Sequence, residues 1–251
     1  MFQGQPRRPD LRGFPLARRR PPRHPLVQTG NLLRALPGLL PIETEPSPVF
    51  TGIVTAIGTI RRLTPIGAGQ DMRVAIATPP GWLEGVAIGA SICCSGCCLT
   101  VVTLAEDLFE VEISAESLSR TTLGAWAEGT RINLERSLRM GDEMGGHVVS
   151  GHVDGVAEIL SVFPENGSHR WTFRLPQGLS RFVAEKGSIT VDGVSLTVNA
   201  ADDTTFGVNL IPHTTEVTAL GTLRPGGRVN IEIDMLARYV ARLRQFEGAG
   251  A

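Results

Sequence analysis

The sequence has 251 residues, enough for one large domain or two small ones, and its 42% hydrophobic and 20% charged residues are typical of a globular protein. The formal net charge of -1 gives no electrostatic reason to expect a nucleic-acid or membrane partner. Because aromatic residues make up only 5%, we expect cores built mainly from Val, Ile, Leu and Ala.

The first 48 residues differ in composition from the rest of the chain. They contain eight of the 24 basic residues, all arginine, together with ten prolines and only three acidic residues. Proline removes backbone donors and clustered arginines repel one another. The sequence therefore predicts a disordered leader over 1–48.

The cysteines bear on the cellular compartment and on metal binding. Cys93, Cys94, Cys97 and Cys98 lie within six positions, unlike the dispersed framework of a secreted disulfide protein. No apolar run of about 18 residues predicts a membrane span, and no secretory signal is recognisable. We therefore expect a reducing, cytoplasmic location. The Cys-x2-Cys spacing is found in zinc sites, but no second pair is present, so we expect no metal.

The remainder of the chain contains an internal repeat. The segment 90–101 matches 187–198 at an offset of 97 residues, and 131–135 matches 228–232 at the same offset. Upstream, 51–54 resembles 150–153 at an offset of 99. Two copies of a unit of this length indicate a duplicated domain rather than a solenoid. We expect one domain over 49–147 and the other over 148–234.

Each copy has the pattern of antiparallel β-structure. In the first copy, short runs rich in Val, Ile and Thr predict strands over 50–60, 72–77, 99–104, 109–113 and 131–134. Ser95-Gly96 and Asp192-Gly193 predict two-residue hairpin turns, because glycine accepts the positive φ that such turns need. A closed barrel of about six strands would leave no exposed edge.

The chain ends in a predicted amphipathic helix. Leu236, Tyr239, Val240 and Leu243 have helical spacing, and Asp234 is a suitable N-cap. We expect 235–251 to form an oligomerisation helix and tail. The predicted fold is all-β: two tandem homologous Greek-key β-barrels followed by a C-terminal α-helix.

Four segments of the sequence resemble the riboflavin synthase family: 49–54, 145–155, 189–198 and 209–214, in the family's order. The family begins Met-Phe-Thr-Gly-Ile-Val and this chain has Val49 in place of that Met, so we expect the native protein to begin at position 49. The resemblance implies a homotrimer in which each active site lies between the N-terminal barrel of one subunit and the C-terminal barrel of its neighbour. Association with lumazine synthase is a further expectation.

The implied activity is that of a transferase, riboflavin synthase. It converts two molecules of 6,7-dimethyl-8-ribityllumazine into riboflavin and 5-amino-6-(ribitylamino)uracil by four-carbon transfer, the last step of riboflavin biosynthesis. No cofactor is required, because one substrate oxidises the other. Alignment of the two reactants can supply about 7–11 kcal/mol of the barrier reduction.

Three other functions compete with this interpretation. A non-catalytic lumazine- or flavin-binding protein of the same fold is the main alternative, although both copies keep polar site residues. A flavin-dependent oxidoreductase would need a nicotinamide-binding Gly-rich turn, and none follows. Oligonucleotide binding would need a basic groove with stacking aromatics, which an acidic body with a single tyrosine does not offer.

The resemblance assigns catalytic roles to His152, Ser91, Cys98 and Lys186. His152 is the expected acid–base group because imidazole titrates near neutral pH. Lys186, the only lysine, is expected to contact a ligand oxygen. Ser91 and Cys98 are expected to be polar contacts or to activate a nucleophile, and Cys98 is not expected to be a covalent nucleophile.

The expected substrate-binding residues divide between the two copies. Those expected in or beside the first half-site are Phe50, which would lie over the site, Gly52, Ile53, Val54, Cys98, Leu99, Thr100, Glu112, Ile113, Ser114, Ala115, Glu116, Ser117, Gly151, His152 and Val153. Those of the second half-site are Lys186, Ser195, Leu196, Thr197, Asn209, Leu210, Ile211, Pro212, His213 and Thr214.

Three further positions leave structure and function open. Asp192 and Asp234 match family positions, but the first also suits a turn and the second a helix cap. Ser95 stands where the family usually has Asn, which removes an amide suited to the turn and leaves the rigidity of that hairpin open.

Overall fold

A computed structural model describes residues 48–247, so the predictions for the leader fall almost entirely outside the described residues. The first barrel contains β1 (Ala56–Pro65), β2 (Met72–Ala77), β3 (Ser91–Cys94), β4 (Cys97–Ala105), β5 (Leu108–Ile113) and β6 (Arg131–Arg136), with α1 (Ala115–Arg120) and the 3₁₀ helix η1 (Thr122–Ala125) before β6. The second contains β7 (Gly155–Glu165), β8 (Ser168–Arg174), β9 (Ser188–Val191), β10 (Val194–Ala201), β11 (Thr205–Leu210) and β12 (Arg228–Ile233), with η2 (Ser180–Phe182), α2 (Pro212–Val217) and η3 (Ala219–Thr222).

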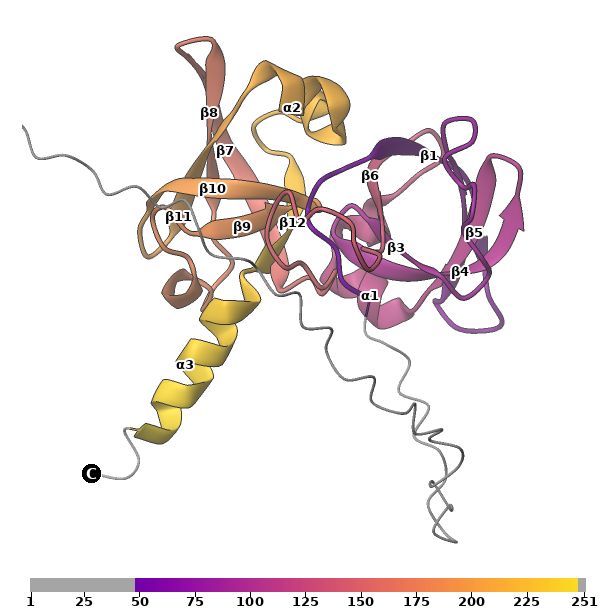
Figure 1. Cartoon of the computed structure of the whole chain (residues 1–251), viewed down its shortest axis with the longest axis horizontal. Coiled ribbons are helices and arrows are strands. Elements are labelled where there is room, and N and C mark those ends of the chain that lie inside the picture. Colours follow the sequence, from indigo (N-terminus) through magenta and orange to yellow (C-terminus); the bar gives the residue numbers. More distant parts are fainter. Residues whose placement is uncertain (1–47, 248–251) are drawn as a thin grey trace, which may run out of the picture. The chain divides into compact units, whose positions relative to one another are not determined.

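Both sheets close into antiparallel barrels with one topology (Figure 1). The first has the strand order β1-β2-β5-β4-β3-β6, and the second, read from its own first strand, has the order β7-β8-β11-β10-β9-β12. The same order in both rings follows from the sequence repeat, since equivalent residues occupy equivalent strands. The predicted all-β fold of two homologous barrels and a terminal helix (α3, Met235–Glu247) is confirmed.

The first predicted strand differs from the structure. It was expected over 50–60, but β1 begins at Ala56, and Phe50 forms only an isolated bridge with Val149. The reason is local: the backbone N–H groups of Thr51 and Gly52 donate to the side chain of Glu135 instead of to a neighbouring strand. The segment before β1 is therefore a loop held by a carboxylate.

The two barrel cores are filled differently. The first core is almost wholly aliphatic, with Phe109 its one fully buried aromatic residue. The second contains a stack in which Phe173 lies between Trp171 and Phe206, with ring centroids 6.0 and 4.9 Å apart. Such rings bury large apolar areas, so a few of them replace several aliphatic side chains in one barrel only.

The two predicted hairpin turns have the expected backbone. Ser95 and Gly96 have φ of 45° and 87°, and Asp192 and Gly193 have φ of 45° and 79°, as a two-residue primed turn requires. The Ser95 hydroxyl accepts a hydrogen bond from the N–H of Asn133 at 3.1 Å. The hydroxyl thus anchors its turn to the neighbouring strand without the amide that the family usually has there.

Two buried asparagines join the barrels at these turns. Asn133 on β6 donates to the carbonyl of Asp192 and accepts from the N–H of Ala219, at 2.8 and 2.7 Å. Asn230 on β12 does the same in the other direction, donating to the carbonyl of Ser95 and accepting from Thr122, both at 2.8 Å. The internal repeat pairs Asn133 with Asn230, but the sequence did not indicate a role for either. Their contacts are reciprocal because the repeats face each other through equivalent elements.

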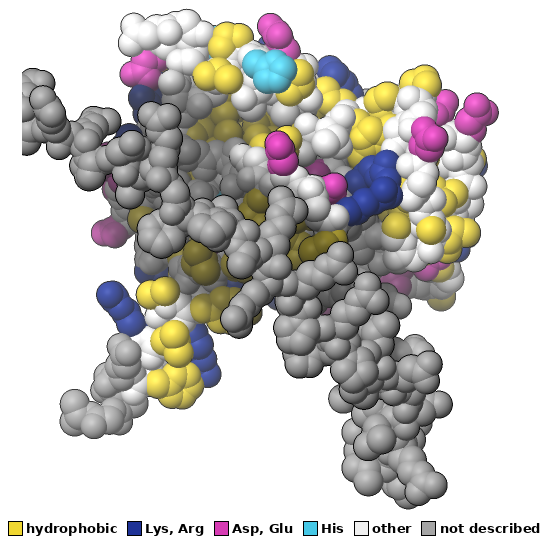
Figure 2. All heavy atoms as spheres, in the orientation of Figure 1, with side chains coloured by type: hydrophobic (Ala, Val, Ile, Leu, Met, Phe, Trp, Pro, Cys, Tyr) yellow, Lys and Arg dark blue, Asp and Glu magenta, His cyan; other side chains and the backbone are white. Residues whose placement is uncertain are grey.

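The last helix, α3, begins at a cap formed by Asp234, whose carboxylate accepts from the N–H of Leu236 at 2.9 Å. This confirms the predicted N-cap. Its apolar side chains are largely exposed: Leu236, Tyr239 and Leu243 are 69%, 61% and 65% exposed. Figure 2 shows hydrophobic and basic side chains side by side on this helix. Across residues 48–247, the helices are all too short or too polar to cross a membrane.

The buried turn residue Asp192 leads to a pH prediction. Burial raises the pKa of Asp192 from 3.8 to about 7, against a hydrogen bond from the N–H of Asn230 that lowers it. A carboxyl with a raised pKa in the folded state contributes stability that is fully present below the unfolded pKa and is lost as the pH rises through the folded pKa. Asp192→Asn keeps the accepting oxygen but cannot ionise.

We therefore expect the free energy of unfolding of the natural protein, relative to Asp192→Asn, to fall between pH 3.8 and about 7. The slope should be at most about 1.4 kcal/mol per pH unit. Denaturant titrations across this range measure it, with Asp203→Asn, an exposed aspartate, as the control. A difference that does not change with pH would contradict a buried, titrating Asp192.

Candidate functional site

Two loops cross from one barrel to the other. The carbonyl of Gly52, just before the first barrel, accepts the N–H of Ser195 on β10 of the second barrel at 2.8 Å. The carbonyl of Gly151, just before the second barrel, accepts the N–H of Cys98 on β4 of the first barrel at 2.8 Å. Each loop therefore docks on the strand that carries a predicted site residue of the opposite barrel.

Both crossings require glycine. Gly52 and Gly151 each have a φ of 75°, and a Cβ would lie 2.6 Å from the Cβ of Ser195 or 2.7 Å from that of Cys98. A left-handed backbone with no room for a side chain excludes other residues.

A buried carboxylate holds each loop. In the first barrel, Glu135 on β6 accepts from the N–H and hydroxyl of Thr51 at 2.6 and 2.7 Å and from the N–H of Gly52 at 2.9 Å. Burial raises the pKa of Glu135, and these hydrogen bonds oppose the shift.

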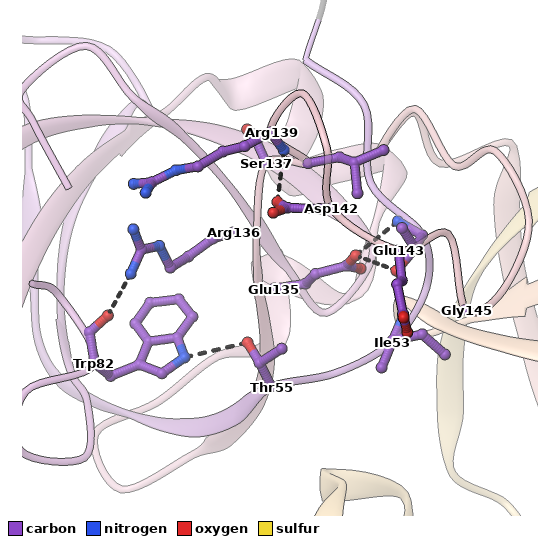
Figure 3. A pocket seen from close by; sticks show the side chains of 12 residues that line it. Ile53, Thr55, Trp82, Glu135, Arg136, Ser137, Arg139, Asp142, Glu143 and Gly145 are labelled. Atoms are coloured by element: carbon purple, nitrogen blue, oxygen red, sulfur yellow. Dashed lines mark hydrogen bonds between the residues drawn. The ribbon is translucent and has the colours of Figure 1, made fainter. Parts of the chain in front are cut away.

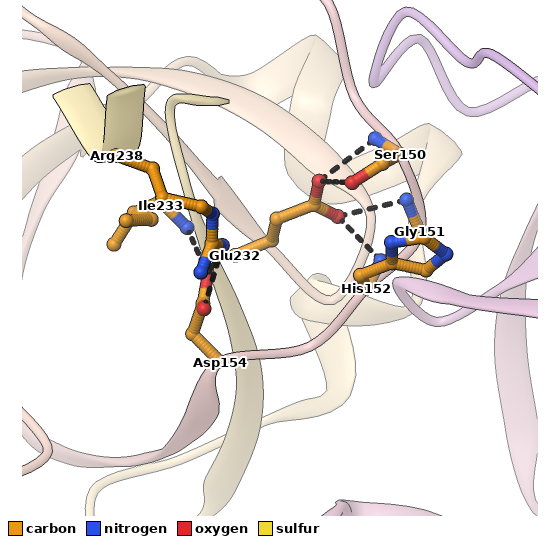
Figure 4. A network of polar contacts seen from close by, with 7 residues as sticks. All are labelled: Ser150, Gly151, His152, Asp154, Glu232, Ile233 and Arg238. Carbon is orange, nitrogen blue, oxygen red and sulfur yellow. Dashed lines mark hydrogen bonds and ion pairs between the residues drawn. The ribbon is translucent and has the colours of Figure 1, made fainter. Parts of the chain in front are cut away.

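Glu232 on β12 repeats the arrangement in the second barrel (Figure 4). It accepts from the N–H and hydroxyl of Ser150 at 2.7 and 2.6 Å and from the N–H groups of Gly151 and His152 at 2.9 and 3.0 Å. Burial raises the pKa of Glu232 as well, again opposed by the hydrogen bonds. The sequence comparison matched Glu135 with Glu232 without assigning them a role.

The crossing places part of the predicted first half-site against the other barrel. Gly52 and Val54 were assigned to the first half-site, but Gly52 binds Ser195 of the second barrel and Val54 packs on the second core. Ile53, assigned with them, lines a cleft with residues of the first barrel. Val153 packs reciprocally on the core of the first barrel. A repeat identifies equivalent positions, but it does not reveal which copy a connecting segment packs against, and here each packs against the other copy.

The predicted residues of the first half-site follow β3, β4, β5 and α1. Ser91 pairs with Thr100 across β3 and β4, and Cys98 lies two residues before Thr100 on the same face. Burial raises the pKa of the Cys98 thiol, although a hydrogen bond with Ser91 lowers it. Ser114 caps α1 by accepting from the N–H of Ser117 at 3.2 Å. Cys98 is thus a neutral thiol at neutral pH.

His152 adjoins this half-site on the loop that docks on Cys98. Its backbone is fixed by Glu232, and its imidazole is exposed. An exposed imidazole on an anchored backbone can exchange protons with a bound molecule or with water.

The second half-site contains a histidine that the sequence analysis passed over. Nδ1 of His147 lies 2.7 Å from the hydroxyl of Ser195, and Nε2 lies 3.2 Å from the hydroxyl of Thr190. Burial lowers the pKa of His147, opposed by the charge of Asp234, so the ring is neutral at neutral pH and can accept the proton of Ser195. The sequence signal for this pair was segment 145–155, which contains His147 as well as His152.

Lys186 lies at the edge of the second half-site in an unusual backbone conformation. Its φ is 65°, and its N–H donates to the carbonyl of Val198. Gly89, the equivalent residue of the first barrel, has a φ of 89° and the same hydrogen bond to Val101. For a residue other than glycine, this left-handed conformation costs about 1–2 kcal/mol of conformational free energy. Glycine would avoid that cost, yet the second barrel has a lysine at this position.

The other predicted residues of the second half-site lie on β10, β11 and α2. Thr197 and Asn209 are exposed, and the Asn209 amide donates to the Ser168 hydroxyl at 2.8 Å. Ile211 is the N-cap of α2, which starts at Pro212. The exposed members therefore form a polar face beside Ser195.

Several predicted site residues point into the barrels. Leu99, Ile113 and Leu210 belong to the barrel cores and support the site strands from inside. Phe50 is fully buried with Cys93 and Val149, and Cys98 packs against this cluster. Phe50 therefore contacts Cys98 from a fully buried position.

The cysteines are free thiols, and burial raises the pKa of all four, that of Cys97 to about 12. Residues 48–247 contain no group of three or more His, Cys, Asp or Glu side chains placed to hold a metal ion.

A cleft of about 540 Å³ opens beside the loop of the first barrel (Figure 3). Its walls include Trp82, Arg136 and Arg139, and it reaches Thr51 and Glu135. The wall groups are already occupied: Arg136 donates to the carbonyl of Glu84 at 3.0 Å, and the Trp82 indole donates to Thr55 at 3.1 Å. Cys98 and Ser195 are not among its lining residues. Of the predicted site residues, Ile53 alone lines this cleft, which is therefore distinct from the strand positions of Cys98 and Ser195.

Comparison with known proteins identifies related sequences and structures. A family model described as Lumazine binding domain matches twice, over residues 51–137 and 150–234. A riboflavin synthase of Brucella abortus (strain 2308) is 50% identical over 204 residues, 79% of this chain and all of the relative. A riboflavin synthase of Bacillus subtilis (strain 168) is 37% identical over 194 residues, 77% of this chain and 89% of the relative.

Solved structures give a similar result. LumP complexed with riboflavin matches with a TM-score of 0.67 and 28% identity, over 73% of this chain and 98% of LumP. LumP complexed with 6,7-dimethyl-8-(1'-D-ribityl) lumazine matches with a TM-score of 0.65 at the same identity and coverage. The two matched segments correspond to the two barrels with their preceding loops.

Proposed function

The chain belongs to the riboflavin synthase family, and we propose that it forms riboflavin from two molecules of 6,7-dimethyl-8-ribityllumazine by transfer of a four-carbon unit. The observation that carries this proposal is the pair of equivalent half-sites, built on Cys98 and Ser195 and each completed by a loop from the other repeat. Two like half-sites suit a reaction between two like substrates.

The residues would divide the chemistry as follows. One lumazine must lose a proton from its C7 methyl group, and the other must become an electrophile by addition at C7. His152, exposed on its anchored loop, would exchange the methyl proton. The neutral His147 would accept the proton of Ser195 or of a water beside it, which favours addition at C7. Ser91 and Cys98 would bind ring-edge atoms of the other lumazine.

Lys186 and the exposed hydroxyls would fix the substrates. The ammonium of Lys186 suits a carbonyl oxygen or a ribityl hydroxyl, and its strained backbone supports a functional role. We propose the remaining predicted residues of both half-sites as further substrate contacts. Riboflavin formation in this scheme uses the second lumazine as oxidant, so it calls for no cofactor.

We further propose a homotrimer in which the open face of one barrel is covered by the opposite barrel of a neighbour. The exposed apolar side chains of α3 support an inter-subunit role for that helix. A cytoplasmic location is supported by the four free thiols. Association with lumazine synthase, which would deliver the substrate, rests on the family resemblance alone.

The direct test is incubation of the purified chain with the lumazine as sole substrate. We expect riboflavin and the ribitylaminouracil in equal amounts, without added metal or nicotinamide, measured by absorbance and chromatography. Binding of the lumazine without turnover would instead favour the non-catalytic alternative, to which the likeness to LumP points.

His152→Ala should lower turnover by about 10²–10⁴, the usual scale for a general acid–base group. Because its imidazole is exposed, the unfolding midpoint should hardly change. His169→Ala on β8, a histidine outside both half-sites, is the comparison variant. Steady-state kinetics at saturating lumazine measure the effect, and near-normal turnover in His152→Ala would remove His152 from the acid–base role.

Removal of residues 235–251 should leave both barrels folded and dissociate the trimer, because the apolar face of α3 is exposed in the single chain. Leu243→Asp should weaken the trimer in the intact chain, whereas Arg244→Asp should do so less. Sedimentation velocity measures the oligomeric state. A stable trimer after truncation would show that α3 is not the main interface.

A further inference from the structure

The loop contacts form two continuous paths between the barrels. The carboxylate of Glu135 binds the N–H of Gly52, and the carbonyl of the same glycine binds the N–H of Ser195. Only one residue therefore separates a side chain of the first barrel from the candidate nucleophile of the second. Glu232, Gly151 and Cys98 form the same path in the opposite direction.

The carboxylates suit this task because, among residues 48–247, hydrogen bonds compensate their charge. No Arg or Lys in the described part of the chain lies within ion-pair distance of Glu135 or Glu232. Each instead accepts at least three short hydrogen bonds from a loop of successive residues. Bonds to a charged acceptor are about twice as strong as neutral ones and directional, so each carboxylate fixes the orientation of its loop.

Near the crossing the two loops also contact each other: Phe50 and Val149 exchange backbone hydrogen bonds of 2.8 and 3.0 Å, and the N–H of His147 donates to the carbonyl of Thr51 at 3.2 Å. Each loop has a left-handed glycine, and the next-but-one residue, Val54 or Val153, packs on the opposite core. The hydrophobic contact sets where the loop lies, and the carboxylate sets how its peptide groups point. Because the carboxylate binds the N–H of the same glycine whose carbonyl binds the opposite barrel, a change at the carboxylate should be felt at Ser195 or Cys98 of that barrel.

We infer that Glu135 is a positioning residue for the second half-site and Glu232 is a positioning residue for the first. Each barrel thus orients the reacting strand of the other, and the two half-sites within one chain are energetically coupled. The catalytic consequence rests on the proposed function, but the coupling through the backbone does not.

Amide hydrogen exchange tests the coupling without reference to activity. Glu135→Gln keeps the size of the side chain but turns an amide NH₂ toward the N–H donors of the loop. In the full chain, exchange of the Ser195 amide should accelerate about ten- to hundredfold, the loss expected for a bond to a charged group, while the Cys98 amide is unchanged. Glu232→Gln should give the reverse pattern.

Two further comparisons keep the test decisive. Glu158→Gln, the same change at an exposed ion pair with Arg174, should accelerate neither amide. Thr51→Val removes the hydroxyl, which donates to Glu135 and accepts from the N–H of Ile53 at 3.2 Å, and should accelerate Ser195 exchange. Thr51→Ser, which copies Ser150 of the repeat, should not. If Glu135→Gln accelerates both amides equally, or Cys98 more than Ser195, the carboxylate is a general anchor and the inference fails.

Double-mutant cycles in kcat/KM test the catalytic consequence. Glu135→Gln combined with Ser195→Ala should lower kcat/KM much less than the product of the single effects, because both changes act on one half-site. Glu135→Gln combined with Cys98→Ser should give the product of the single effects. If the two Glu→Gln variants accelerate amide exchange on the opposite barrels as predicted but leave kcat/KM unchanged, the positioning role is refuted. If the natural chain is inactive on the lumazine, the proposed function is refuted but the coupling is not.

Discussion

A carboxylate that is removed from water must be compensated by a cation or by hydrogen bonds, and Glu135 and Glu232 are compensated by hydrogen bonds. The donors are backbone N–H groups at the start of each repeat, so the chain cannot enter a barrel as a regular strand there. It enters as a loop with a left-handed glycine. That glycine places its carbonyl on the opposite barrel, and the half-sites depend on this placement.

The duplicated scaffold supports two chemically different half-sites. Cys98 and Ser195 occupy equivalent positions, yet the first is a neutral thiol whose pKa is raised by burial and the second is a hydroxyl paired with His147. The residue equivalent to His147 in the first repeat is Pro48, which cannot act as a base. Gly89 and Lys186 differ in the same way, by an ammonium. In the proposed reaction one lumazine donates a four-carbon unit and an identical lumazine accepts it. Two half-sites with different side chains suit these two different roles.

The sequence predicted the features that depend on local pattern or on the repeat. The closed barrels, the turns at Ser95 and Asp192 and the cap at Asp234 followed from alternation, glycine positions and capping chemistry. The crossing of the loops did not follow, because it depends on hydrogen bonds between residues as far apart as Gly52 and Ser195. The same limit explains why the packing of Val54 on the second core and the contact of His147 with Ser195 were not predicted.

The central claim is that each chain has two half-sites, each a strand face of one barrel with a loop from the other repeat. A crystal structure with an unreactive lumazine analogue tests it most directly. The account requires two analogues per chain, one on β4 beside the loop at Gly151 and one on β10 beside the loop at Gly52. A single analogue per chain, or one seated in the cleft lined by Trp82 and Arg136, would contradict it.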